Sequence, residues 1–155
     1  MTAEHRVFEL RTVAWDHPDG ERLRRDQQAE ISARYGTDDS EPGPKPSAAD
    51  ITIFFVAYDG DEPIGCGGLR ALDAHHGEVK RMYVIPERRG SGAAASILSH
   101  LEAEAKRRGW ERLVLETGTE QPDAVRFYER EGYTPIPKFG YYVDSEWSLC
   151  YEKRF

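Results

Sequence analysis

Two glycines within a basic segment are the most distinctive chemical feature of the chain. The segment reads Glu87-Arg88-Arg89-Gly90-Ser91-Gly92-Ala93 and lies between an expected strand and an expected helix. Gly90 and Gly92 remove side chains where backbone N–H groups must come close to a ligand. The N-terminus of a helix leaves several N–H groups unpaired and carries the positive end of the helix dipole. The pattern therefore predicts a phosphate or pyrophosphate site beside Arg88 and Arg89, rather than a plain glycine turn.

A dinucleotide-binding enzyme is one interpretation of this segment. Residues 90–95 satisfy the pattern G-x-G-x-x-A, and Glu116 ends the next expected strand, where a ribose-binding acid would lie. Against this, the motif lies past the middle of the chain, and five residues separate Val84 from Gly90. Only one parallel crossover is visible, whereas a doubly wound sheet needs several. These features favour a coenzyme A site over an NAD(P) site.

The elements around the glycine segment form one expected βαβ unit. A strand over Glu78–Val84 precedes the segment, and a helix from Ser91 or Gly92 to Arg108 follows it. A short buried strand over Arg112–Glu116 should run parallel to the first strand. A further helix is expected from Pro122 to Glu131, because proline suits the first position of a helix.

The first half of the chain is predicted to add three strands and one helix. The second and third strands of the chain should form an antiparallel meander with the strand over Glu78–Val84. The residues 15–20 are expected to break a first strand, and the helix over Glu21–Tyr35 is only weakly amphipathic because Gln27 interrupts its apolar stripe. Residues 37–50 are rich in proline and carboxylates and are expected to form an acidic loop. The predicted strands outside the βαβ unit are His5–Thr12, Ile51–Tyr58, Pro63–Leu72 and Glu146–Glu152.

Length and composition limit the possible functions. A chain of 155 residues fits one domain, residues 1–155, with a proper core. The net charge of −7 disfavours binding to nucleic acid or to an anionic membrane. Cys66 and Cys150 lie far apart in the sequence, so we expect a reducing cytoplasm. The opening residues have no apolar run behind them, so no signal peptide is expected, and no apolar run reaches the roughly 20 residues that would cross a bilayer. His75 and His76 have no partner at ligand spacing, so no metal site is expected.

The second half of the chain resembles the GNAT superfamily of N-acetyltransferases, over roughly residues 51–135. Three linked motifs in the family's order carry the resemblance, and one departure is Glu87, where the family's pattern begins with Gln or Arg. The motifs are Lys80-Arg81-Met82-Tyr83-Val84-x-Pro86-Glu87-Arg88-Arg89-Gly90-Ser91-Gly92-Ala93, then Leu115-Glu116-Thr117-Gly118, and then Ala124-Val125-Arg126-Phe127-Tyr128-Glu129-Arg130-Glu131-Gly132-Tyr133.

The resemblance implies an α+β fold with three layers. Its sheet would be mixed and twisted, with six or seven strands and helices on both faces. The strands at Glu78–Val84 and Arg112–Glu116 would splay apart and hold the pantetheine arm of acetyl-CoA, and an amide of Met82 or Val84 would polarise the thioester carbonyl. The residues implied to bind the cofactor are Met82, Tyr83, Val84, Arg88, Arg89, Gly90, Ser91, Gly92 and Ala93.

The resemblance also implies catalytic roles for three side chains. Tyr128 is similar to the family's tyrosine that gives a proton to the coenzyme A sulfur, although Phe127-Tyr128 also fits simple core packing. An alkylammonium has a pKa near ~10, so a base or a water relay helps to form the neutral amine. Glu78 matches a glutamate that is the base in some members, and its alternative is a solvated residue at a strand end. Glu116 is the second candidate, with a structural hydrogen bond as its alternative.

The sequence thus predicts a cytoplasmic enzyme that transfers the acetyl group of acetyl-CoA directly to a primary amine. The acidic residues around Asp38, Asp39 and Glu41 suggest a small, cationic acceptor such as a polyamine, an amino sugar or an amino acid derivative, with a protein lysine or N-terminus as the alternative. The residues that either border the acceptor pocket or pack together are Tyr141, Tyr142, Asp144 and Trp147. A non-catalytic acyl-CoA-binding module on the same fold is the competing class. A homodimer is possible by analogy with the family.

Overall fold

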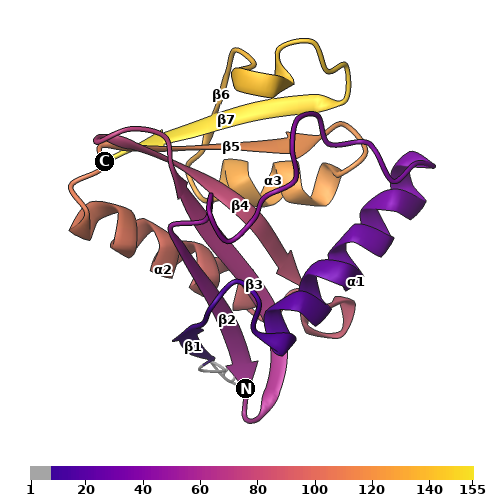
Figure 1. The fold of residues 1–155 in the computed structure, drawn as a ribbon, viewed down its shortest axis with the longest axis vertical. Helices are drawn as coiled ribbons and strands as arrows, with labels where there is room; N and C mark the ends of the chain where they lie inside the picture. Colours follow the sequence, from indigo (N-terminus) through magenta and orange to yellow (C-terminus); the bar gives the residue numbers. More distant parts are fainter. Residues whose placement is uncertain (1–7) are drawn as a thin grey trace.

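A computed structural model describes residues 8–155, in which seven strands form one mixed sheet (Figure 1). The strands occur in the order β1-β2-β3-β4-β5-β7-β6, and only β4 and β5 are parallel neighbours. Strands β2, β3 and β4 are consecutive antiparallel neighbours, which confirms the predicted meander, and β1 adds a further antiparallel strand beside β2. The strand bounds are β1 Glu9–Thr12, β2 Ile53–Asp59, β3 Glu62–Ala71, β4 His76–Val84, β5 Arg112–Gly118, β6 Thr134–Ile136 and β7 Ser148–Arg154.

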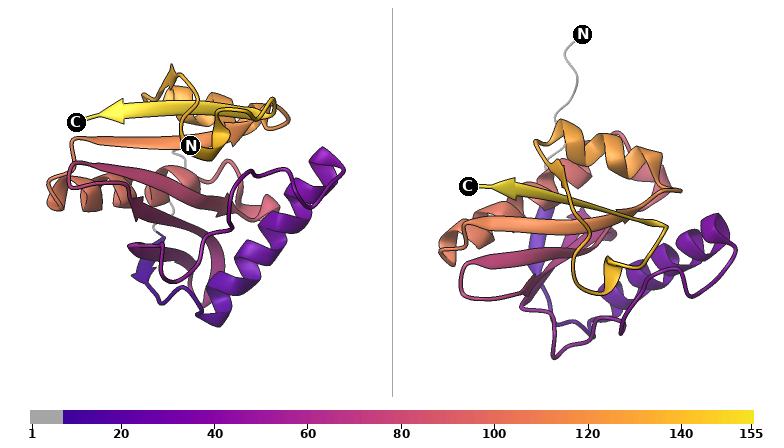
Figure 2. Two further views of the ribbon diagram at one scale, coloured as in Figure 1. Left: turned by 45° about the horizontal axis from the view of Figure 1, so that its top comes forward. Right: turned by 90° about the horizontal axis from the view of Figure 1, so that it is seen from above.

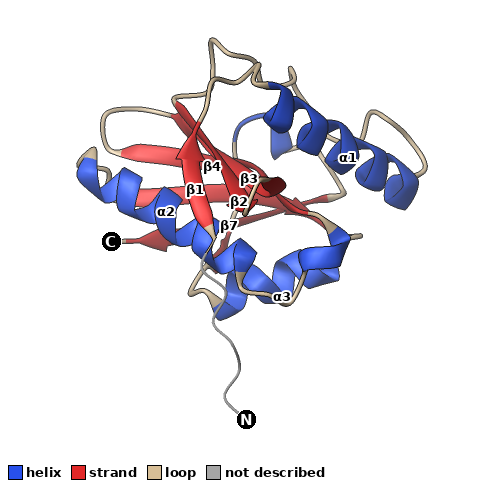
Figure 3. Cartoon of the chain, turned by 90° about the horizontal axis from the view of Figure 1, so that it is seen from below, coloured by secondary structure: helices blue, strands red, loops and turns tan. Residues whose placement is uncertain are grey.

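Three α-helices cover the two faces of the sheet, as the three-layer prediction requires. Helix α1 (Pro18–Tyr35) lies on one face, and α2 (Ala93–Arg107) and α3 (Pro122–Arg130) lie on the other (Figures 1 and 3). Two short 3₁₀ helices, η1 (Pro86–Arg88) and η2 (Gly140–Tyr142), lie in the connections. The fold is therefore the expected mixed sheet with helices on both sides.

Helix α2 packs unusually close to β3 because two glycines there lack side chains. A Cβ atom on Gly67 would lie 2.8 Å from Cγ2 of Ile97, and one on Gly65 would lie 2.9 Å from Cδ1 of the same residue. Ile97 and Leu101 are completely buried in this contact. The close contact fixes α2, and with it the glycine segment at its N-terminus, against the centre of the sheet.

The parallel strands β4 and β5 separate after three paired positions. Their pairing joins His76 to Arg112 and ends where Glu78 meets Val114. Beyond that point β5 continues along β7, whereas β4 continues along β3 toward η1 (Figure 2). The predicted splay of these two strands is therefore present, and it opens on the side where both strands have their C-terminal ends.

Several elements differ from their predicted bounds at one or both ends. Helix α1 begins at Pro18, in the segment expected to be a break, because proline occupies its first turn and the ring Nδ1 of His17 accepts a hydrogen bond from the N–H of Asp19 at 3.1 Å. Strand β7 continues to Arg154 by pairing with Arg112 of β5. Residues 5–7 of the expected first strand lie outside the described residues.

Candidate active site

Two cavities meet between the splayed strands and share a wall. The larger, of about 480 Å³, lies between α1, the end of β4, the glycine segment and α3. The smaller, of about 120 Å³, lies between α1, the loop 37–50, β4, β5 and η2. The residues that line both are Gln27, Ile31, Met82, Gln121, Ala124 and Tyr128. This arrangement gives two compartments in contact at one wall.

The glycine segment has the geometry expected of an anion site. Gly90 and Gly92 have φ angles of 77° and 90°, which non-glycine residues rarely adopt, and both line the larger cavity. The space beside their Cα atoms is open for at least 4 Å, so no side chain fills the turn. Within residues 8–155, the N–H groups of Gly90, Gly92 and Ala94 have no hydrogen-bond partner. They are therefore available to the oxygens of a diphosphate.

Ser91 and Ala93 contribute to the turn itself rather than to the cavity wall. The Ser91 hydroxyl donates a hydrogen bond to the carbonyl of Arg88 and so closes the turn. Ala93 is almost fully buried at the start of α2. Neither residue lines the larger cavity. Their predicted contact with the cofactor would therefore be made by backbone groups.

Both arginines beside the turn form ion pairs with carboxylates. Arg88 donates to Asp59 at 3.2 Å and to Glu62 at 3.1 Å, which ties η1 to the β2–β3 hairpin. Arg89 donates to the carbonyl of Val84 at 3.0 Å and to Glu30 of α1 at 2.8 Å. A bound phosphate would therefore compete with these carboxylates for the guanidinium groups.

A bulge in β4 shapes the wall between the two cavities. Pairing with β3 joins Lys80 to Gly68 and Tyr83 to Cys66, so it skips Arg81 and Met82. Arg81 has a φ of 57°, the only positive φ at a non-glycine among residues 8–155. Such strain costs on the order of 1–3 kcal/mol and is concentrated at functional sites. The bulge turns the backbone of Met82 toward the site, where its carbonyl accepts a hydrogen bond from Gln27 Nε2 at 2.9 Å.

Tyr128 of α3 lies at the wall that both cavities share. The residue is 7% exposed, and its ring packs edge-on against Phe127 and Tyr133. Its hydroxyl has no hydrogen-bond partner among residues 8–155. Burial, aided by the nearby carboxylate of Glu116, raises the pKa of the Tyr128 phenol, so the group stays protonated and can donate. Tyr128 therefore has a packing role and also presents a free hydroxyl to the cavities.

Glu116 of β5 lines the smaller cavity, and the pKa of its carboxyl group is raised. Burial raises the pKa of its carboxyl to about 7, against a hydrogen bond of 2.7 Å from the Ser148 hydroxyl that lowers it. The nearby carboxylates of Glu41 and Glu78 also raise this pKa, and Lys80 lowers it. A carboxyl group with a pKa close to neutrality can exchange a proton at working pH.

Glu78 of β4 is buried rather than solvated, which rules out the solvated strand-end interpretation. The residue is 1% exposed and its Oε2 accepts a hydrogen bond of 2.8 Å from the Tyr142 hydroxyl. Arg70 and Lys80 lie 3.5 and 3.6 Å from its two oxygens. Both oxygens therefore have cationic or hydroxyl partners within the protein.

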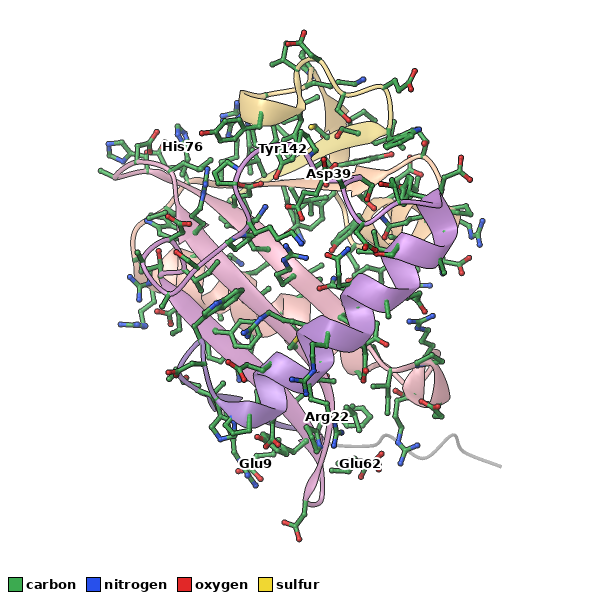
Figure 4. The ribbon with its side chains drawn as sticks, turned by 45° about the vertical axis from the view of Figure 1, so that its right-hand side comes forward. Glu9, Arg22, Asp39, Glu62, His76 and Tyr142 are labelled. Carbon is green, nitrogen blue, oxygen red and sulfur yellow. The ribbon has the colours of Figure 1, made fainter. Side chains whose placement is uncertain are left out.

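The loop 37–50 and the segment that contains η2 lie far apart in the sequence, and both contribute residues to the wall of the smaller cavity. The loop 37–50 packs on η2, where the ring of Tyr141 lies so close to Gly43 that a Cβ there would come within 2.5 Å of it. Figure 4 shows Asp39 and Tyr142 at this end of the molecule, with Glu9 and Glu62 at the other. Tyr142 and Trp147 line the cavity, whereas Tyr141 and Asp144 do not. Of the four residues predicted either to border an acceptor pocket or to pack together, two therefore line the smaller cavity.

Three polar residues that line this site were not among the predicted site residues. Gln27, which was noted only as an interruption of a stripe, is buried and lines both cavities. Lys80 and Arg81 belong to the expected strand, but their side chains turn into the smaller cavity. The signal for Gln27 was its polarity at a buried helical position, whereas nothing in the sequence marks the bulge that orients Lys80 and Arg81.

Neither a metal centre nor a membrane span is found in the part of the chain that the structure describes. No group of three or more His, Cys, Asp or Glu side chains is arranged to hold a metal ion among residues 8–155. His76 instead contacts Asp73 through Nδ1 at 2.9 Å. Among the same residues, no helix has the length and apolar character needed to cross a bilayer.

Comparison with known proteins relates this architecture to acetyltransferases. The sequence profile of the Acetyltransferase (GNAT) family matches residues 6–133. An uncharacterized N-acetyltransferase of Bacillus subtilis, YsnE, is 38% identical over 103 residues, which cover 65% of this chain and 68% of that protein. The IAA acetyltransferase of Azospirillum brasilense is 37% identical over 102 residues, covering 64% and 66%. The chain thus matches about two thirds of the length of each relative.

Solved structures show the same fold over nearly the whole chain. A Klebsiella pneumoniae protein assigned as an acyl-CoA N-acyltransferase has 28% identity and a TM-score of 0.78, covering 95% of this chain and 97% of that one. A GNAT family acetyltransferase of Elizabethkingia anophelis, solved with acetyl-CoA bound, has 16% identity and a TM-score of 0.70, covering 96% and 98%. Since the family profile spans most of the chain and the fold agrees, this protein belongs to the GNAT family of acetyl-CoA-dependent N-acetyltransferases.

Proposed function

We propose that this chain, as a single catalytic domain, transfers the acetyl group of acetyl-CoA directly to a primary amine of a small molecule. Acetyl-CoA would occupy the larger cavity and the amine the smaller one, so that both reach the shared wall at Met82 and Tyr128. The contact of the two cavities at this wall is the observation that carries the proposal. Direct transfer needs such contact, because the amine nitrogen must approach the thioester carbon to bonding distance.

The larger cavity offers groups for each part of the cofactor. The free N–H groups of Gly90, Gly92 and Ala94 would bind the diphosphate, and the backbone of Met82, Tyr83 and Val84 would pair with the pantetheine arm. Arg89 would exchange its bonds to Glu30 and Val84 for contacts to phosphate and pantetheine. An amide of Met82 or Val84, freed by the bulge or by the splay, would stabilise the oxyanion.

Glu116 is the better of the two candidate bases. A base must be deprotonated at working pH and must have an oxygen free for the amine or for a relaying water. The pKa of Glu116 is about 7, and only Oε2 carries a hydrogen bond, from Ser148. Glu78 has partners on both oxygens, so we assign it a structural role in the cavity wall. Tyr128 would then protonate the departing thiolate.

The substitution Tyr128→Phe tests the proposed proton donor. It removes the free hydroxyl and keeps the ring that packs against Phe127 and Tyr133, so stability should change little. We expect kcat for thiol release from acetyl-CoA to fall by about 10²-fold or more, the typical contribution of a positioned acid, with unchanged affinity for acetyl-CoA. An unchanged kcat would contradict the role of Tyr128.

The alternative of a non-catalytic acyl-CoA-binding module makes a different prediction. A module would bind acetyl-CoA tightly, yet no amine in a broad panel would release its thiol. The smaller cavity argues against it, because a module needs no second compartment lined by a carboxylate whose pKa is near neutrality. An NAD(P)-binding enzyme would instead be stabilised by NAD(P) and not by coenzyme A.

The acceptor is a small molecule in this proposal. The smaller cavity has a volume of about 120 Å³, which suits a small acceptor better than a segment of a protein chain. The aminoalkylphosphonate N-acetyltransferase of Salmonella typhimurium is 40% identical to this chain over 63 residues. The acceptor in the name of that relative is also a small amine. We place the reaction in the cytoplasm, which fits the unpaired thiols of Cys66 and Cys150. Dimer formation stays a prediction.

A further inference from the structure

Two adjacent cationic residues in the wall of the smaller cavity share one carboxylate. Lys80 Nζ lies 3.0 Å from Oε1 of Glu41, and an Arg81 guanidinium nitrogen lies 3.1 Å from Oε2 of the same residue. Both cationic side chains are only 10% exposed. A buried pair of cations needs a matching anion, because an uncompensated buried charge is strongly destabilising.

The bulge in β4 is the reason why both side chains reach the same carboxylate. Successive residues of a regular strand point to opposite faces of the sheet, so Lys80 and Arg81 would normally separate. The φ of 57° at Arg81 interrupts this alternation. The strained backbone therefore produces a forked cation site, in which a lysine and an arginine converge on the two oxygens of one anion.

Glu41, which supplies that anion, is not part of the rigid scaffold. It belongs to the loop 37–50, which has no helix or strand, and its side chain is 31% exposed. The cations by contrast lie on the central strand β4, where Lys80 also donates to the Tyr142 hydroxyl at 3.0 Å. A loop can move away at lower cost than a central strand. Glu41 can therefore leave the cations, whereas the cations cannot follow it.

The charges around the cations show what must replace Glu41. Among residues 8–155, Arg70, Lys80 and Arg81 form ion pairs with only two carboxylates, and one of these, Glu78, is held between Arg70 and Lys80 while Glu41 is the other. The carboxyl of Glu116 also acts on Lys80, but its pKa of about 7 leaves it only partly charged. When Glu41 leaves, the cluster retains an excess of positive charge at the cavity surface. The negative charge of Glu41 is thus already neutralised by Lys80 and Arg81. Glu41 therefore no longer supports the expectation, drawn from the acidic loop, of a purely cationic acceptor.

We infer that the acceptor is a primary amine that also carries an oxyanion, a carboxylate or a phosphonate, which displaces Glu41 from Lys80 and Arg81. The oxyanion binds the forked cations, and the amine points toward Glu116 and Tyr128, which line the same cavity. Glu41 therefore imitates the acidic group of the substrate while the cavity is empty. The inference rests on the proposed acetyl transfer, but its cation site can be tested without turnover.

A matched set of amines tests the selectivity. The compounds 3-aminopropanoate and 3-aminopropylphosphonate carry the oxyanion, whereas propylamine lacks it and 1,3-diaminopropane replaces it with a cation. We expect kcat/KM for the better oxyanion compound to exceed that for propylamine by about tenfold or more, as for a charge-assisted hydrogen-bond pair. The variant Lys80→Met should remove this preference mainly through KM. Equal or better use of propylamine or the diamine by the wild type would overturn the inference.

An anion-binding measurement separates this inference from the transfer activity. Glu41→Gln removes the carboxylate that Lys80 and Arg81 share. Methylphosphonate or acetate should therefore raise the melting temperature of the variant by about 3 °C or more above their effect on the wild type. The two anions distinguish a phosphonate site from a carboxylate site. The double variant Glu41→Gln with Lys80→Met should lose this additional shift.

Glu152→Gln is the matched control for that measurement. Glu152 also accepts from two arginines, Arg112 at 2.8 Å and Arg154 at 3.3 Å, but it lies outside both cavities of the site. It should show no additional anion effect. An identical anion effect in Glu41→Gln, Glu152→Gln and the wild type would overturn the inference whether or not any amine is acetylated. An additional rise in melting temperature with anions in Glu41→Gln alone would support the cation site. It would do so even if none of the four amines were acetylated, and that result would contradict the proposed acetyl transfer instead.

Discussion

At the scale of single residues, the two candidate bases differ in their surroundings although both are glutamates on neighbouring strands. Glu78 lies where β4 and β5 are still paired, and it is enclosed by Arg70, Lys80 and Tyr142. Glu116 lies beyond the point of separation and faces the cavity. The sequence predicted both as candidates and placed Glu78 before Glu116. It could not show that Glu78 is enclosed, because the partners of Glu78 come from three different elements.

Glu116→Gln should change both the rate and the stability in a pH-dependent manner. The folded-state pKa of about 7 is raised above the ordinary value of 4.5, so the folded chain holds this proton more tightly than the unfolded chain. The wild type therefore loses stability from this group as pH rises from about 4.5 to 7. The neutral glutamine avoids that loss, so the variant should be more stable than the wild type at pH 8 by on the order of 2 kcal/mol, and not at pH 4.

The rate of the same variant gives the catalytic part of the test. Since the base must be deprotonated, wild-type kcat should rise as pH increases through about 7, and Glu116→Gln should be slow and lack this rise. Denaturant unfolding at pH 4 and pH 8 and a pH profile of thiol release measure the two effects. A profile in Glu116→Gln that keeps the rise near pH 7 would show that another group is the base.

At the scale of elements, the predictable parts are those whose signals are local. The glycine segment, the helix after it and Pro122 at the start of α3 all carry their signals within a few residues, and these elements were placed within about two residues of their observed bounds. The bulge at Arg81 was not predictable, because its cause is the register between β3 and β4, not the type of the residue. The start of α1 was missed because Pro18 was taken as a breaker and not as an N-terminal residue.

Gly67→Ala tests the close packing of α2 on β3. The added Cβ would lie 2.8 Å from Ile97 Cγ2, 3.0 Å from Met82 Sδ and 3.2 Å from Leu101 Cδ1, so α2 must shift. We expect a loss of about 1–3 kcal/mol in the free energy of unfolding, with weaker binding of acetyl-CoA because the glycine segment moves with α2. Combining the change with Ile97→Ala, which makes room, should cost less than the sum of the two single changes. Strictly additive losses in urea unfolding would show that Gly67 and Ile97 do not contact each other as described.

At the scale of the whole molecule, the two halves of the site differ in how far sequence could predict them. The proposed cofactor side is built from contiguous motifs between residues 80 and 133, so the resemblance predicts it, and the fold confirms the arrangement of the elements that carry these motifs. The acceptor side joins Gln27, Glu41, Lys80 and Tyr142, which come from a helix, a loop, a strand and a 3₁₀ helix. Only long-range contacts such as Gly43 against Tyr141 bring these together, and no local pattern encodes them.

A crystal structure of the chain with acetyl-CoA tests the central claim most directly. We predict that the diphosphate accepts hydrogen bonds from the N–H groups of Gly90 and Gly92, and that Arg89 releases Glu30. The thioester should lie at the wall shared by the two cavities, between Met82 and Tyr128. A cofactor whose diphosphate lies away from this turn, or whose thioester does not reach Tyr128, would contradict the account.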